Sequence, residues 1–335
     1  MRTSILAALW AIAMVASANA AIKEEPVTYT DGETTMKGFV VYDDAIQTKR
    51  PGIVLVPEWW GITNHMHDQA RDFARQGYTA FIADMYGDAK TADNPKDASA
   101  LSSSVMKNPK AMESRFNAAR EQLAKQASVN PQRIGAAGYC FGGAVVLNMA
   151  RSGADLAAVA GFHAILGVNT PAPAPGTVKA KILVLNGADD SLVKPEQYDA
   201  LKKDFDAAKV DYRIIEYPGA VHAFTNPEST ELGKKFNLPF RYDAKAGGTY
   251  GDLRSGRVSF REVGTTNALE CEALSGRWER APLGLGAGSA RRRRLQDVGA
   301  TSSSEGRRRW PTVSGKNERL CVPVDNAISI MRYRS

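Results

Sequence analysis

The stretch Gly138-Tyr139-Cys140-Phe141-Gly142-Gly143 lies between an apolar run that ends at Ala137 and an apolar helical pattern over residues 144–150. This order predicts a strand, a tight turn and a helix. Glycine two residues before and two residues after Cys140 lets the backbone turn sharply where a larger side chain would clash. The turn would expose the Cys140 thiol beside the first amides of the helix, whose positive dipole end favours a thiolate. The stretch therefore predicts a nucleophile elbow with cysteine in place of serine.

A single cysteine between glycines can also be a small buried apolar residue that allows close packing of helix and sheet. The order of residues downstream decides between the two interpretations, because a nucleophile elbow is followed in the chain by an acid and then a histidine. An apolar strand beginning at Lys181 runs into a turn that contains Gly187. We predict that Asp190, three residues after Gly187, is the acid, and that Asp189 caps the turn or is solvated.

The histidine candidate is His222, in the loop that follows an apolar strand over residues 212–217. The chain has four histidines, and His65, His67 and His163 all precede the acid. We interpret His163 as a packed residue at a strand end. His65 and His67 are two residues apart near the start of a predicted helix and so point to different faces, which argues against a metal pair.

An apolar run from Pro51 to Pro57 predicts a strand covered on both faces, and Glu58, Trp59 and Trp60 follow it. The carboxyl ends of strands are where open α/β sheets form their ligand crevice. Most glutamates are solvated, and the two tryptophans could be core residues. A carboxylate next to two indoles at a strand end would instead be partly desolvated and could accept a proton from a nearby thiol.

Residues 26–246 resemble the dienelactone hydrolase family of the α/β-hydrolase fold. Four features carry the resemblance, in order along the chain: Glu58-Trp59-Trp60-Gly61, the Gly-x-Cys-x-Gly-Gly elbow at 138–143, the Gly-x-x-Asp-x-x-Val turn at 187–193, and Gly-Ala-Val-His-Ala-Phe at 219–224.

The resemblance implies roles for six residues. Cys140, Asp190 and His222 would form a catalytic triad, Glu58 would regulate the thiol, and the backbone N–H groups of Phe141 and Trp59 would form the oxyanion hole. In this family the glutamate equivalent to Glu58 contacts the resting cysteine and takes its proton when substrate binds.

The alternation of strands and helices predicts an α/β-hydrolase fold, with a mostly parallel, doubly wound sheet and helices on both faces. The family implies about eight strands. We expect antiparallel entry strands over 27–30 and 35–42, a helix over 63–76 and a strand over 78–86. The polar, Ser-rich segment 88–108 is interpreted as a solvated connection, followed by a helix over 111–127.

Residues 1–20 have the pattern of a secretory signal peptide: Arg2, an apolar run from Ile5 to Val15, and a small-residue end at Ala18-Asn19-Ala20. The apolar run is shorter than the ~20 residues that a membrane-spanning helix needs. We therefore predict cleavage after Ala20, a periplasmic or secreted protein without a membrane span, and a domain over 21–246.

The composition changes at Gly247. Residues 1–246 contain 27 basic and 27 acidic side chains, whereas residues 247–335 contain 16 basic and 9 acidic, so the net charge of +7 arises in this tail. Apolar periodicity gives way to Gly, Ser and Arg runs, which predicts disorder. The arginine clusters could bind nucleic acid or anionic lipid, or the tail could be a solvated extension. We favour a third interpretation, a shift of reading frame near Ala246 that removes the final helix expected in the family.

We expect hydrolysis of a small ester or lactone through a covalent acyl-enzyme, with no metal, organic cofactor or nucleic-acid partner. Cys140 has no disulfide partner in the domain, because Cys271 and Cys321 are both in the tail, so its thiol is better explained by chemistry than by cross-linking. The alternatives are a general carboxylesterase or acyl hydrolase on the same site, and a non-catalytic periplasmic binding protein disabled by its altered C-terminus.

Overall fold

The computed structural model describes residues 21–167 and 170–247. The predicted signal peptide over residues 1–20 lies outside these ranges. The predicted disordered tail also lies outside them, apart from Gly247, which ends a short helix. Both stay predictions.

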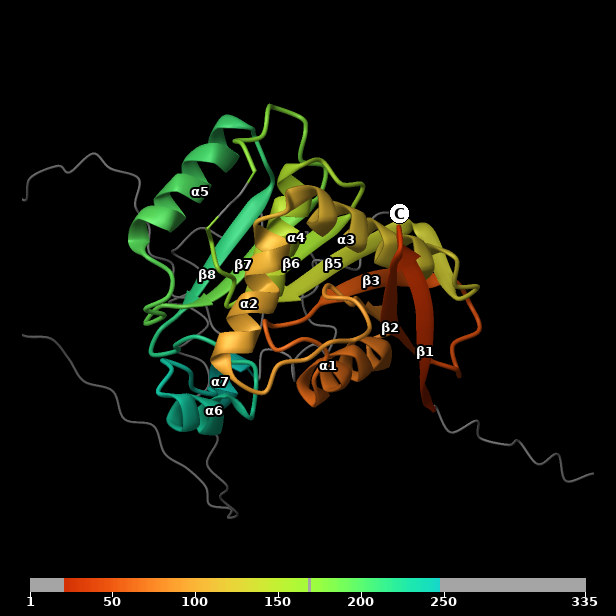
Figure 1. Ribbon diagram of the computed structural model, residues 1–335. Helices are drawn as coiled ribbons and strands as arrows, with labels where there is room; N and C mark the ends of the chain where they lie inside the picture. Colours follow the sequence, from red (N-terminus) through yellow and green to blue (C-terminus); the bar gives the residue numbers. More distant parts are fainter. Residues whose placement is uncertain (1–20, 168–169, 248–335) are drawn as a thin grey trace, which may run out of the picture. The chain divides into compact units, whose positions relative to one another are not determined.

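Eight strands of the described residues form one sheet in the order β1-β2-β4-β3-β5-β6-β7-β8 (Figure 1). The strands are β1 (Ile22–Asp31), β2 (Thr34–Asp43), β3 (Arg50–Val56), β4 (Thr79–Ile82), β5 (Val129–Tyr139), β6 (Ala158–Phe162), β7 (Lys181–Gly187) and β8 (Tyr212–Tyr217). β2 is antiparallel to β1 and to β4, and every other pair is parallel. The predicted strand number and mostly parallel sheet are confirmed.

Helices cover both faces of this sheet, as predicted. On one face lies α1 (Asn64–Arg75), and its residues Met66, Ala70 and Phe73 are buried in a core shared with β3 and β4. The other face carries α2 (Pro95–Met106), α3 (Pro109–Ala124), α4 (Phe141–Arg151) and α5 (Pro195–Ala207), which contribute to a second core. After β8 come α6 (Ser229–Phe236) and α7 (Ala244–Gly247).

The register of the parallel strands brings the predicted site residues to one edge of the sheet. Val56 at the end of β3 pairs with Gly138 in β5, and Tyr139 at the end of β5 pairs with Phe162 at the end of β6. Gly187 at the end of β7 pairs with Tyr217 at the end of β8. The segments that follow these five strands therefore start side by side, which is where an open α/β sheet forms its crevice.

The segment 88–108 is not the solvated connection that its composition suggested, because most of it forms α2. Asn94 caps this helix by accepting a hydrogen bond from the Asp97 N–H at 3.0 Å, and Pro95 occupies the first turn, where its missing N–H costs nothing. Ala98 and Val105 are buried. Leu101 and Met106 are partly buried and pack against the same core as Val105. Because the helix is otherwise Ser-rich, its hydrophobic periodicity is weak and its capping residues are the better signal.

The strand predicted over 78–86 is also shorter than expected, since β4 ends at Ile82. Asp84 is buried, and its carboxylate accepts hydrogen bonds from the backbone N–H groups of Tyr86, Gly87 and Ala89. These bonds turn the chain away from the sheet. The apolar run continues through residues 85 and 86 because their side chains are buried in the loop.

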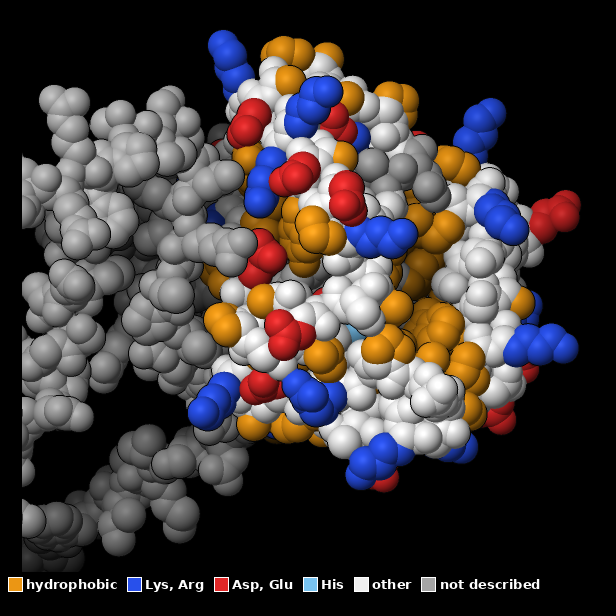
Figure 2. Space-filling view, turned by 90° about the vertical axis from the view of Figure 1, so that its left-hand side faces the viewer, with side chains coloured by type: hydrophobic (Ala, Val, Ile, Leu, Met, Phe, Trp, Pro, Cys, Tyr) orange, Lys and Arg blue, Asp and Glu red, His pale blue; other side chains and the backbone are white. Residues whose placement is uncertain are grey.

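Figure 2 shows one face of the domain, on which Lys and Arg side chains are interspersed with Asp and Glu. This distribution agrees with the equal numbers of basic and acidic residues up to Ala246. The face in this view has no large patch of a single charge.

Candidate active site

Cys140 lies between β5 and α4 in a backbone conformation that non-glycine residues rarely adopt, with φ 54° and ψ −114°. Its N–H donates to the Phe162 carbonyl at 3.0 Å, and its carbonyl accepts from the Ala144 N–H at 3.2 Å. The residue is only 7% exposed, so the expectation that the turn exposes the thiol is wrong, because the surrounding loops cover it. A strained turn held from both ends is what a nucleophile elbow requires, so the predicted strand-turn-helix geometry is present.

The glycines of the elbow are required because backbone atoms occupy the space that a Cβ would need. A Cβ on Gly138 would lie 2.0 Å from the Gly142 carbonyl oxygen, and one on Gly142 would lie 2.2 Å from the Val56 carbonyl oxygen. A Cβ on Gly143 would lie 2.6 Å from the Cβ of Ala164. The close approach at Gly142 also brings the start of α4 against the end of β3.

Asp190 and His222 form a buried pair at the ends of β7 and β8. The His222 Nδ1 atom is 2.7 Å from the Asp190 Oδ2 atom, and both side chains are fully buried. Oδ1 of Asp190 accepts from the Leu192 N–H at 2.9 Å, which fixes the carboxylate. Asp189, the competing aspartate, is exposed. The structure thus brings Asp190, and not Asp189, to the predicted histidine.

Cys140 is a charged neighbour of the His222 imidazole. Burial by itself would lower the pKa of His222, but the charge of Cys140 and the hydrogen bonds with Asp190 and Cys140 outweigh burial and raise the pKa to about 10. The structure therefore brings Cys140, Asp190 and His222 together in one buried cluster.

Glu58 is buried beside this cluster. The Asn226 Nδ2 group donates to its Oε2 atom at 2.8 Å, and its Oε1 atom is 4.0 Å from Nε2 of His163. Among the described residues, Asn226 and not Cys140 is its hydrogen-bond partner. Burial, only partly offset by the Asn226 hydrogen bond and the charge of His222, raises the pKa of Glu58 to about 7. Near neutral pH this carboxyl can both hold and release a proton.

The pKa of Glu58 predicts a dependence of stability on pH. In the unfolded chain the carboxyl titrates near its ordinary value of 4.5, so the folded state binds more protons between pH 4.5 and about 7. The stabilisation that Glu58 contributes is present below pH 4.5 and is lost as the pH rises through 7, by about 3 kcal/mol. Urea unfolding of the wild type and of Glu58→Gln at a series of pH values measures this difference. We expect the glutamine variant to lack this loss, and parallel stability curves would contradict the prediction.

His163 and Thr225 complete the buried polar group. Nε2 of His163 is 2.8 Å from the Thr225 hydroxyl oxygen, which is in turn 3.4 Å from Nε2 of His65. The His163 ring packs edge-on against that of His222, with centroids 5.2 Å apart. Burial holds the pKa of His163 well below its ordinary value and lowers that of His65 to about 4, so both rings are neutral. His163 is a packed residue at a strand end, as expected.

Sequence reasoning missed Thr225 and Asn226, although both are in the His222 loop. The signal that could have found them is their position three and four residues after His222, in a loop that must fold back over the crevice. Ala223 has a positive φ of 59°, and the Asn226 N–H donates to the Ala223 carbonyl at 3.1 Å. This turn directs Asn226 towards Glu58.

The two predicted oxyanion-hole residues lie at neighbouring chain turns. Phe141 is the first residue of α4, where a helix leaves its N–H groups without partners inside the helix. Trp59 is in the turn after β3, next to the start of α4. A small cavity adjoins both turns. It is lined by Pro57, Glu58, Gly61, Ile62, Ala83, Asp84, Met85, Tyr86, Lys90 and Phe141.

Two further properties concern cofactors and membranes. Residues 21–167 and 170–247 contain no group of three or more His, Cys, Asp or Glu side chains arranged to hold a metal ion. The same residues include no helix with the length and apolar character needed to cross a bilayer.

The mostly parallel eight-stranded sheet, the elbow at the end of β5 and the Asp–His pair beyond β7 and β8 define an α/β hydrolase. The sequence model of the dienelactone hydrolase family matches residues 36–249. The chain belongs to the dienelactone hydrolase family. It is therefore a carboxylic ester hydrolase, and the resemblance seen in the sequence is confirmed.

Individual relatives agree with this assignment. A protein of Escherichia coli (strain K12) that carries the provisional name carboxymethylenebutenolidase is 31% identical over 188 residues, which is 52% of this chain and 67% of the relative. Protein usf of Aquifex pyrophilus is 27% identical over 187 residues, which is 54% of this chain and 80% of usf. The crystal structure of P91, a dienelactone hydrolase-like promiscuous phosphotriesterase from metagenomic libraries, has 32% sequence identity and a TM-score of 0.63, covering 70% of this chain and 96% of P91.

Proposed function

We propose that this hydrolase cleaves a small ester or lactone by covalent catalysis, with Cys140 as nucleophile, His222 as acid and base, and Asp190 as the group that orients His222. The observation that carries the proposal is the buried Asp190–His222 pair, 2.7 Å apart, whose imidazole has the elbow cysteine as its other charged neighbour. Packing alone does not require a buried acid, histidine and thiol in this chain order. Nucleophilic catalysis requires all three.

The first half of the reaction forms the acyl-enzyme. The Cys140 thiolate attacks the carbonyl carbon, and the electron pair of the carbonyl bond moves to its oxygen, which accepts hydrogen bonds from the Phe141 and Trp59 amides. As this oxyanion collapses, the carbon–oxygen bond to the leaving group breaks. His222 in its protonated form gives its proton to the departing alkoxide, and the acyl group stays on sulfur as a thioester.

The second half returns the enzyme to its starting state. Neutral His222 takes a proton from water, which attacks the thioester carbonyl, and the same two amides stabilise the second oxyanion. Collapse of this intermediate releases the carboxylic acid and the Cys140 thiolate, which again pairs with protonated His222. Asp190 stabilises the imidazolium in both halves.

Glu58 would control the protonation of the thiol in the resting enzyme. The pKa of about 7 lets its carboxyl take up and release a proton in the range where the enzyme works. The carboxyl is held by Asn226, so this role requires Glu58 or the thiol to move when substrate binds. The family resemblance supports this role for Glu58, with Asn226 as the partner that holds the carboxyl in the resting state.

Dienelactone-like lactones are the substrates that we propose first, because relatives carry the name carboxymethylenebutenolidase. The enol leaving group of a dienelactone is a weak base, which reduces the demand on His222. General carboxylesters on the same site are the alternative. A binding protein without turnover is the second alternative.

Steady-state hydrolysis by purified residues 21–335 tests the proposed function. A dienelactone and p-nitrophenyl acetate are offered separately, and paraoxon is a third substrate because P91 is a phosphotriesterase. We expect turnover of at least one carboxylic ester, with the preferred substrate separating a lactonase from an esterase. A folded protein whose thiol is labelled but which turns over neither ester would contradict the proposal and favour the binding protein.

We propose that the enzyme acts in the periplasm or outside the cell, because residues 1–20 have the pattern of a signal peptide. Amino-terminal sequencing of the mature protein tests this location. A mature chain that starts at Ala21 would support it, and a chain that retains residues 1–20 in the cytoplasm would contradict it.

A further inference from the structure

Tyr86 contacts both residues whose amides the proposed function assigns to the oxyanion hole. Its hydroxyl donates to the Trp59 carbonyl oxygen at 3.0 Å. Its ring stacks on the Phe141 ring, with centroids 5.7 Å apart and an angle of 29° between the ring planes. The side chain is 7% exposed and lines the cavity beside Glu58 and Phe141. One buried side chain therefore links the turn after β3 with the first residue of α4.

The hydroxyl contact completes the hydrogen bonding of a tight turn at residues 58–61. The Glu58 carbonyl accepts from the Gly61 N–H at 3.1 Å, and the Trp60 carbonyl accepts from the Ala92 N–H at 3.0 Å. The Trp59 carbonyl, between these two, accepts from Tyr86. With three successive carbonyls fixed, the peptide planes of the turn cannot rotate freely. The Trp59 N–H shares its peptide plane with the Glu58 carbonyl, and the Tyr86 bond fixes the following plane. The turn is therefore held on both sides of the Trp59 Cα, which fixes the direction of the N–H.

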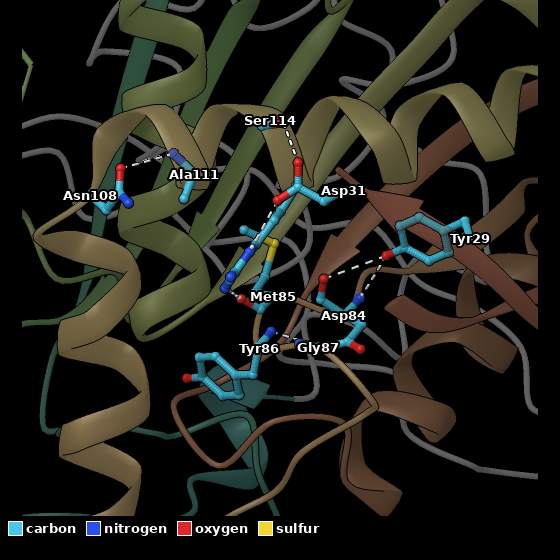
Figure 3. Close-up of polar contacts among 10 residues, drawn as sticks. Tyr29, Asp31, Asp84, Met85, Tyr86, Gly87, Asn108, Ala111 and Ser114 are labelled. Carbon is cyan, nitrogen blue, oxygen red and sulfur yellow. Dashed lines mark hydrogen bonds and ion pairs between the residues drawn. The ribbon is translucent and has the colours of Figure 1, made fainter. Parts of the chain in front are cut away.

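Both partners from outside the turn come from one loop, residues 83–94 between β4 and α2. Figure 3 shows how Asp84 holds the start of this loop. Its carboxylate accepts from the N–H groups of Tyr86 and Gly87 at 2.9 Å each and from that of Ala89 at 2.8 Å. The Tyr29 hydroxyl accepts from the Asp84 N–H at 3.1 Å. These bonds fix the backbone of Tyr86, so its side chain is presented to Trp59 from a rigid support.

The Tyr86 hydroxyl stays protonated and can therefore always donate to the Trp59 carbonyl. Burial, together with the negative charges of Cys140 and Asp84, raises the pKa of Tyr86 far above the ordinary value of 10. The hydroxyl keeps its proton throughout the pH range in which the thiolate of Cys140 would form. The donor to the Trp59 carbonyl is therefore present in every step of the reaction.

We propose that Tyr86 is a positioning residue of the oxyanion hole, which holds the turn that carries the Trp59 N–H by binding the Trp59 carbonyl in the next peptide plane, and holds the start of α4 through the Phe141 ring. The inference rests on the proposed function, because it needs an oxyanion to form at these amides. The hydroxyl donates to the Trp59 carbonyl and not to a side chain of the proposed triad. It acts on the transition state through the direction of the Trp59 N–H.

Tyr86→Phe tests this role because it keeps the stacked ring and removes only the hydroxyl. Loss of a direct oxyanion donor costs about 10²- to 10³-fold in kcat, and loss of a group that orients the donor should cost less, about 10-fold. We expect this fall in kcat for p-nitrophenyl acetate with KM within about 2-fold of wild type, since the interaction strengthens only in the transition state. Alkylation of Cys140 by iodoacetamide forms no oxyanion, so its rate should stay unchanged.

Tyr212→Phe is the matched control. Its hydroxyl also makes one hydrogen bond, to the Asp206 Oδ1 atom at 2.9 Å, but Tyr212 is the first residue of β8, at the end of the strand opposite to the site. It should leave kcat unchanged.

The outcomes separate the inference from the proposed function. Equal losses of esterase and alkylation rates in Tyr86→Phe would overturn the inference, because the hydroxyl would then support the nucleophile as a whole. Unchanged esterase activity in Tyr86→Phe would overturn it too, and so would an equal loss of kcat in Tyr212→Phe. Absence of ester turnover in the wild type would overturn the proposed function, and the inference with it.

Discussion

Cys140→Ala is expected to lower the rate of ester hydrolysis by about 10⁴-fold or more, because the thioester can no longer form and only the binding and oxyanion contributions remain. The fold should survive, since the change removes one sulfur atom from a residue that makes its structural hydrogen bonds through the backbone. Initial rates with the preferred ester, together with urea unfolding, measure both effects. The thiol-labelling signal of the domain should disappear in the same variant.

Cys271→Ala controls for the loss of any thiol. Cys271 lies in the tail, outside the residues that the structure describes, and we expect this variant to keep the wild-type rate. A Cys140→Ala protein that is folded and retains more than a few per cent of the activity would remove Cys140 from the mechanism. Hydrolysis would then require water activated directly by His222.

The second large effect is expected from Asp190→Asn, which should lower kcat by about 10²- to 10⁴-fold. The carboxylate raises the pKa of His222 and fixes its Nδ1 atom, and an asparagine amide can offer the wrong hydrogen-bonding group to that nitrogen. Because the carboxylate stabilises the imidazolium, its removal should lower the pKa of His222. Without the carboxylate the imidazolium loses its proton at lower pH, so the basic limb of the kcat/KM profile should move to lower pH.

Asp189→Asn is the matched control for this variant. The two aspartates are adjacent, yet Asp189 is exposed whereas the Asp190 side chain is fully buried against His222. We expect Asp189→Asn to keep both the wild-type rate and the wild-type pH profile. If the two variants behaved alike, the assignment of the acid to Asp190 would be wrong.

The arrangement of the sheet and the elbow could be predicted from the sequence because each depends on local constraints. Strands buried on both faces appear as continuous apolar runs, and β3 and β7 are of this kind. The elbow is specified by glycines for which no other residue fits, as the 2.0 Å and 2.2 Å approaches at Gly138 and Gly142 show. The chain order of acid and histidine then followed from the fold.

The surroundings of the site could not be predicted, because they depend on contacts between residues far apart in the chain. Asn226 reaches Glu58 across 168 positions, and Tyr86 reaches Trp59 across 27. Asp84 interrupts an apolar run and ends β4 by accepting backbone N–H groups, which no periodicity indicates. Helix α2 was missed because tertiary packing of a few apolar side chains overrides a Ser-rich composition.

The two ends of the chain could be interpreted only from composition and sequence pattern. The signal peptide and the disordered tail rest on composition and pattern alone, and they lie outside the described residues except for Gly247. The resemblance implies a final helix after Ala246, where the sequence has Gly, Ser and Arg runs, and a shift of reading frame there stays a prediction.

The most direct test of the central claim is to trap the acyl-enzyme. Wild-type protein is mixed with p-nitrophenyl acetate, quenched with acid in the burst phase, and analysed by intact mass and peptide mapping. We predict a mass increase of one acetyl group, located on Cys140 and absent from Cys140→Ala. A burst of p-nitrophenol with the acetyl group on another residue, or steady turnover with no adduct at any time, would contradict covalent catalysis by Cys140.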